Sequence, residues 1–110
     1  MDQVGIFIVK KTITIDQARK LAEKEAIFLW ELYIPDGSEI FSDKYFSGKS
    51  AWMFIRNQEI AIPDNDPFAL SSYVVSRRGE VRTFGEIYPN ENECQRIVDY
   101  MSDYFDKKGL

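Results

Sequence analysis

The sequence predicts a single α+β domain over residues 1–110, in which a small antiparallel sheet of four to five strands packs against an N-terminal and a C-terminal helix. Two stretches with helical periodicity flank a central region whose apolar residues follow the two-residue period of strands. The chain is long enough to bury one core, and no repeat or Gly/Ser-rich linker divides it. Its apolar content of 45% is typical of a packed globule.

The N-terminal elements are a strand and a helix. Residues 4–10 are rich in β-branched and aromatic side chains, which predicts a short strand. Thr14 is a good N-cap, and Gln17 stands three residues later, where it completes a capping box at the start of the helix. The pattern does not show at which residue this helix ends, because residues 26–35 are apolar on nearly every side. A turn follows at 35–37.

Strand periodicity begins soon after that turn. It is clearest over residues 50–57, where both faces are apolar, as in a central strand. Residues 58–63 follow as a second short strand ending at a proline. Residues 64–71 read as a loop, and 72–87 as a β-hairpin whose turn places Gly79 where a positive φ is needed.

The last predicted element is a helix over residues 90–107. Asn90 is a good N-cap, acids follow in the first turn and lysines close the last turn, as the helix macrodipole favours. Apolar residues from Cys94 to Phe105 recur at helical spacing and predict the stripe that packs on the sheet. Cys94 belongs to that stripe, so we expect a buried core thiol rather than a nucleophile.

Charge and composition argue against several classes of function. The chain has 18 Asp and Glu against 14 Lys and Arg, a net charge of -4, which disfavours nucleic acid and favours basic partners. No apolar run approaches the roughly 20 residues of a membrane span. The first lysines follow the short apolar stretch instead of preceding it, unlike a secretory signal. A single cysteine fits a reducing compartment, so we expect a cytoplasmic protein.

The sequence predicts a protein that is not an enzyme and that needs no metal or cofactor. It has no histidine, the commonest general base and metal ligand. The motif SGKS at 47–50 resembles the end of a phosphate loop, but Asp43 occupies the place of the required first glycine. Asp64 and Asp66 have the spacing of calcium ligands, yet a proline and a phenylalanine follow where further ligands belong. The 18 acids permit many carboxylate pairs, and none is singled out.

Two adjacent arginines, Arg77 and Arg78, occupy the tip of the predicted hairpin. Residues at such a tip are the most exposed in the fold and need no ligand, so the first interpretation is a solvated turn. The second is a small-molecule or phosphate site that these two residues form with Arg82 and Lys49, which requires the four groups to converge on one pocket. Nucleic-acid binding would require a basic face with interleaved aromatic residues, which this stretch lacks.

Recognition of a protein partner is predicted in loop 63–71, because loops on a rigid scaffold frequently carry recognition. Asp64 and Asp66 would steer a basic surface toward the loop, and Phe68 would anchor in the partner. Alternatively, Phe68 folds back into the core and the acids only solvate the turn. A second acidic run without intervening basic residues offers the next candidate surface: Asp36, Glu39 and Asp43.

The order of these elements carries a family resemblance. A helix opening ITIDQARKLAEKEA, a tryptophan strand AWMFI, a short second strand, a loop and a hairpin SYVVSRRGEVRTFG follow one another over residues 12–86. This arrangement resembles the YrhB-like small immunity proteins of bacterial toxin systems. The resemblance implies a cytoplasmic antitoxin that occludes a cognate toxin by binding, with no chemistry of its own. The acidic charge agrees with a basic nuclease as that toxin.

A structural homodimer is the remaining alternative. Its subunits would assemble through an exposed sheet edge. The sequence leaves open whether the protein is a monomer or a homodimer.

Overall fold

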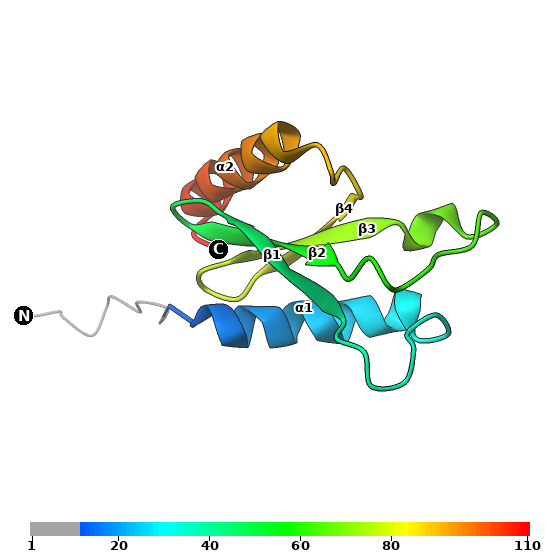
Figure 1. Cartoon of the computed structure of the whole chain (residues 1–110). Coiled ribbons are helices and arrows are strands. Elements are labelled where there is room, and N and C mark those ends of the chain that lie inside the picture. The colour runs from blue at the N-terminus through cyan, green and yellow to red at the C-terminus, as the bar shows by residue number, and fades with distance from the viewer. Residues whose placement is uncertain (1–11) are drawn as a thin grey trace, which may run out of the picture.

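The computed structural model describes residues 12–110 and confirms the α+β fold (Figure 1). Its four strands form one antiparallel sheet in the order β1-β2-β3-β4, and the two helices cover opposite faces of it. The strand expected over residues 4–10 lies outside the described residues. The elements are α1 (Ile15–Trp30), β1 (Phe41–Ser47), β2 (Ala51–Arg56), the 3₁₀ helix η2 (Pro67–Ala69), β3 (Ser71–Ser76), β4 (Val81–Gly85) and α2 (Glu91–Lys108).

Helix α1 begins at the predicted capping box and packs on the sheet through small side chains. The Thr14 hydroxyl accepts from the Gln17 amide, and the Gln17 side chain accepts from the Thr14 amide. Every fourth residue faces the sheet and is fully buried, which places short side chains over most of the contact and one large side chain at its end: Ala18, Ala22, Ala26 and Trp30. This alanine stripe lets the helix lie close to the strands.

Strand β2 is the central strand that its pattern predicted, because all six of its residues are buried. Trp52 and Phe54 face the core beneath α1, whereas Met53 and Ile55 face the core beneath α2. Because successive side chains of β2 point to opposite faces, this one strand contributes to two separate hydrophobic clusters, one on each side of the sheet.

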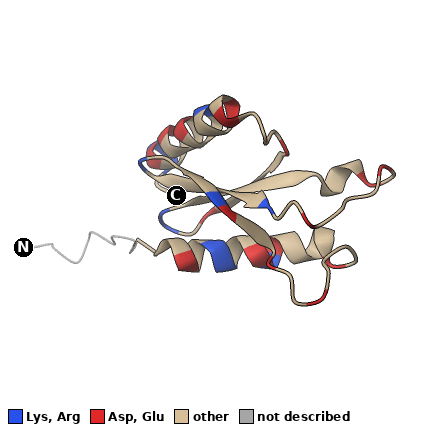
Figure 2. Cartoon of the chain, in the orientation of Figure 1, with Lys and Arg blue, Asp and Glu red and all other residues tan. Residues whose placement is uncertain are grey.

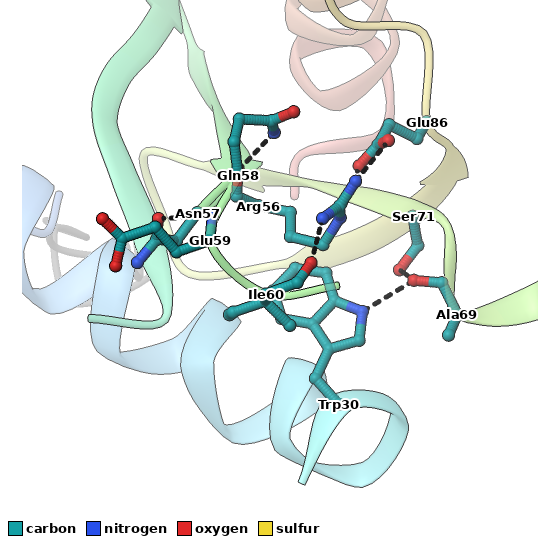
Figure 3. Close-up of polar contacts among 9 residues, drawn as sticks. All are labelled: Trp30, Arg56, Asn57, Gln58, Glu59, Ile60, Ala69, Ser71 and Glu86. Carbon is teal, nitrogen blue, oxygen red and sulfur yellow. Dashed lines mark hydrogen bonds and ion pairs between the residues drawn. The ribbon is translucent and has the colours of Figure 1, made fainter. Parts of the chain in front are cut away.

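The second strand expected at residues 58–63 is wrong. That segment is a turn and loop, and the strand that pairs with β2 on this side is β1. The cause is visible in Figure 3: Arg56 is almost fully buried and donates to the carbonyl of Ile60, which folds the chain back. The same guanidinium makes a two-pronged ion pair with Glu86, at 3.0 Å and 2.9 Å.

The hairpin and the last helix follow the sequence prediction. Gly79 has a φ of 97° at the β3–β4 turn, a conformation that favours glycine. Asn90 caps α2 by accepting from the Glu93 amide. Cys94 is fully buried against the sheet, and burial raises the pKa of its thiol, which agrees with a core role.

The SGKS motif forms the tight turn between β1 and β2, and this turn rests on α2. The Ser50 amide donates to Ser102 Oγ at 3.2 Å, and the Ser50 hydroxyl donates to Asp106. Gly48 approaches so closely that an added Cβ would lie 2.4 Å from Ser102 Oγ and 3.0 Å from the Val98 carbonyl oxygen. Because the motif joins two strands and leads into no helix, it is not a phosphate loop.

Candidate functional site

The last turn of α1 and the residues that follow it present large apolar side chains to solvent. Phe28 and Leu32 are each 86% exposed and stand one turn apart, on the side of the helix away from the alanine stripe. This explains why residues 26–35 are apolar all round: one side of the helix packs on the sheet and the other is uncovered. The sequence analysis missed both residues, although their helical offset from the buried alanines is the signal that points to them.

Loop 63–71 is fastened beside this end of α1 by two hydrogen bonds. Trp30 Nε1 donates to the Ala69 carbonyl at 2.7 Å (Figure 3), and the Tyr33 hydroxyl donates to Asp66 Oδ2 at 2.6 Å. Hydrogen bonding to the Asp66 carboxylate raises the pKa of the Tyr33 phenol. The loop is therefore held in a defined position on the helix.

The structure distinguishes the three residues that the sequence proposed in this loop. Phe68 is 87% exposed, so the alternative in which it folds back into the core is wrong. Asp64 is exposed and has no side-chain bond within residues 12–110, so it is free to act as a steering charge. Asp66 is half-buried and holds the loop through Tyr33, which makes it a positioning residue first.

A cleft of about 400 Å³ lies at the end of α1, beside Asp66 of the loop. Its lining combines apolar and acidic side chains: Phe28, Leu29, Glu31, Leu32, Tyr33 and Asp66. We call this cleft together with the exposed Phe68 the α1-end surface.

Acidic residues predominate in the two segments that adjoin the α1-end surface. Segments 31–43 and 57–70 contain four and three acids, respectively, and no lysine or arginine. Figure 2 shows them on the α1–β1 connection and on the loops beyond β2, whereas most basic residues lie elsewhere. Of the second candidate run, Asp36 and Glu39 are exposed on that connection, while Asp43 lies on β1 and borders a separate depression with Glu39.

The basic residues are only partly brought together. Lys49, Arg77 and Arg78 line one cavity of about 170 Å³, whereas Arg82 does not line it and pairs with Glu80. Lys49 is already engaged, because its Nζ lies 3.0 Å from Asp103 and also pairs with a second carboxylate on α2. These contacts weaken the phosphate-site interpretation.

The interpretation of Arg77 as a solvated tip residue is wrong. Its guanidinium lies 4.2 Å from the ring centroid of Trp52 and donates to the carbonyls of Gly48 and Lys49, at 3.0 Å and 3.1 Å. Arg77 therefore ties the two hairpins of the sheet together. Of these two arginines only Arg78 is exposed, as expected for a residue in a solvent-exposed turn.

Within residues 12–110, no group of three His, Cys, Asp or Glu side chains is placed to hold a metal ion. Neither helix of this part of the chain has the length and apolar character that crossing a membrane requires. Comparison with known protein families, with curated proteins and with solved structures found no match.

Proposed function

We propose that this protein is a cytoplasmic immunity protein that binds a basic toxin domain, a nuclease, and neutralises it by occlusion. One observation carries the binding role: Phe28, Leu32 and Phe68 are each more than 85% exposed, and the adjoining segments 31–43 and 57–70 contain acids but no lysine or arginine. The family resemblance contributes the toxin as the kind of partner. The α1-end surface contributes the place where the partner docks.

Exposed aromatic and aliphatic side chains of this size are unusual on a surface that serves only solvation. Interfaces obtain most of their affinity from a few such anchors, each contributing about 2 kcal/mol or more when a partner buries it. Acids around the anchors add little affinity, but they accelerate encounter with a basic surface. The arrangement combines an apolar anchor with an acidic border, which fits a basic protein.

The test first asks whether a neighbouring gene encodes a toxin C-terminal domain, and such a domain is then the binding partner in the assay. Its association and dissociation rates are measured by surface plasmon resonance for the unchanged protein and for two variants. Phe68→Ala is expected to raise the dissociation rate by about thirtyfold, which corresponds to about 2 kcal/mol. Asp64→Lys is expected to slow association at low salt, with a smaller effect at high salt.

Matched controls use residues that are exposed but lie away from the α1-end surface. Tyr100→Ala removes an aromatic side chain that is 63% exposed on α2, and Asp16→Lys reverses an exposed charge in the first turn of α1, at the opposite end of that helix. Both are expected to leave the rates unchanged. Absence of binding to the neighbouring toxin, or equal losses in variants and controls, would contradict the proposal.

Light scattering separates this proposal from self-association. The edge strands of the described sheet are β1 and β4, where a second copy would add its strand in a sheet-edge dimer. We expect a monomer at micromolar concentration, since the proposed surface serves a different protein. A stable dimer that Phe28→Ala dissociates would assign the α1-end surface to a second copy instead.

A further inference from the structure

We infer that the cleft beside the end of α1 accepts an arginine side chain of the partner. The inference rests on the proposed function and deepens it, because it names the group that the surface recognises. Three features of the cleft lead to it: an apolar wall, two carboxylates and the C-terminal end of a helix.

The apolar wall suits the stem of a long cationic side chain. Leu29 and Leu32 offer aliphatic surface, and the ring of Phe28 is 86% exposed, so its face is open to a flat group. Arginine stacks its planar guanidinium on aromatic rings and lays its methylene groups along apolar surface.

The carboxylates of Glu31 and Asp66 supply the negative charge. No lysine or arginine within residues 12–110 forms an ion pair with either of them. The Tyr33 phenol occupies one oxygen of Asp66 and fixes its orientation without neutralising it, because the phenol is uncharged at neutral pH. An incoming cation therefore meets charges that the described part of the chain leaves uncompensated.

The position of Glu31 supports the same conclusion independently. Glu31 is the C-cap residue of α1, and the last turn of that helix contains no basic residue. A helix C-terminus already carries partial negative charge, so an acid there opposes the macrodipole and contributes nothing favourable to the helix. A residue that breaks a local rule of folding in this way is expected to serve recognition.

Arginine fits this lining better than an aliphatic side chain does. An aliphatic group would cover the two carboxylates without a partner, which is costly. A cleft of about 400 Å³ lies within the range of small-ligand sites and holds a guanidinium with its stem. The planar fork of arginine also matches carboxylate geometry, whereas the ammonium of lysine offers a point charge.

Nuclear magnetic resonance titration tests the inference with two probes of the same shape. N-acetyl-arginine amide carries the guanidinium, and N-acetyl-citrulline amide replaces it by a neutral urea group. The arginine probe is expected to shift the amide signals of residues 28–33 and of Asp66 with saturation at millimolar concentration, as suits a small ligand. The citrulline probe is expected to bind at least about tenfold more weakly.

Variants localise the binding. Phe28→Ala and Glu31→Gln are each expected to weaken the arginine probe by about fivefold or more, and Glu31→Gln to keep or slightly raise the melting temperature. Asp16→Asn, at the other end of α1, and Tyr100→Ala are the controls and are expected to leave binding unchanged. Equal shifts with both probes, shifts spread over the whole surface, or equal effects of Asp16→Asn and Glu31→Gln would each overturn the inference.

The two proposals fail in different ways. If the toxin binds with the expected sensitivity to Phe68 but the arginine probe does not select the cleft, the inference is wrong and the proposed function stands. If the arginine probe binds in the cleft but the neighbouring toxin does not bind the protein, the proposed function is wrong and the site remains.

Discussion

Replacing Arg77 by alanine is expected to destabilise the fold by about 2 kcal/mol, whereas Arg78→Ala is expected to cost less than about 0.5 kcal/mol. The two residues are neighbours in one turn and carry the same charge. They differ in their contacts, because Arg77 stacks on Trp52 and donates to two backbone carbonyls, while Arg78 is exposed. The pair therefore separates the effect of contacts from the effect of net charge.

The magnitude follows from these contacts. A cation that stays partly exposed over an aromatic ring, as Arg77 does over Trp52, contributes about 0.5 to 1 kcal/mol, and a charged hydrogen bond about 1.5 kcal/mol or more, which partial exposure reduces. The backbone bonds of Arg77, from its amide to Ser50 and from Ile13 to its carbonyl, survive in the alanine variant. A loss of about 2 kcal/mol lowers the melting temperature by about 10 °C in a domain of this size.

Thermal and urea unfolding followed by circular dichroism measure the difference. Arg77→Lys is expected to fall between the unchanged protein and Arg77→Ala, because its ammonium keeps the charge but cannot reach both carbonyls in one plane. If Arg77→Ala and Arg78→Ala have equal midpoints, the contacts of Arg77 contribute nothing and the residue is the solvated tip that the sequence suggested.

Three further predictions concern other contacts. Gly48→Ala is expected to lower the stability by about 1 to 3 kcal/mol through overpacking, and adding Ser102→Ala to that variant should recover part of the loss. If the urea midpoint does not recover in the double variant, the close approach of Gly48 to Ser102 is contradicted. Glu86→Ala is expected to cost about 3 kcal/mol, more than Glu86→Gln, because it leaves the buried Arg56 guanidinium unpaired; equal melting temperatures would refute this. The bond from Tyr33 to its carboxylate partner contributes fully below pH 10, the phenol's ordinary pKa, and its contribution is lost as pH rises through the raised pKa. Excess hydrogen exchange over residues 64–70 should then appear only above pH 10, and Tyr33→Phe should show it at neutral pH.

Local signals predicted the helices and the hairpin well, because their determinants lie close together in the chain. The capping box of Thr14, the cap of Asn90 and the glycine at 79 act within three or four residues. Tertiary contacts explain why the sequence analysis missed strand β1 and why it wrongly expected a strand at residues 58–63. In β1 only Phe41 and Phe46 are buried, so its edge position hides the strand pattern. Residues 58–63 have a strand composition, but the Arg56 side chain takes the carbonyl that a strand neighbour would need.

The candidate site was predicted in part. Phe68 and Asp64 lie in a loop whose polarity and length mark it as exposed, so sequence reasoning reached them. Phe28 and Leu32 were missed, because apolar residues in a helix usually indicate core, and their helical offset from the alanine stripe was the one signal that pointed to an outer face. The roles of Asp66 and Arg77 depend on partners more than 20 residues away, which no local pattern reveals.

Because α1 packs on the sheet through its alanine stripe, the residues on its outer face can change without loss of the fold. Its small residues contact the sheet along the first three turns together with Ile15, Arg19 and Leu21, so substitutions at 28, 31 and 32 leave that contact untouched. Phe28 and Leu32 belong to neither hydrophobic cluster of the core, so changes there are largely independent of the core contacts. Substitutions on the outer face, whether natural or engineered, can therefore change which partner is bound one residue at a time, while the inner face keeps the molecule folded.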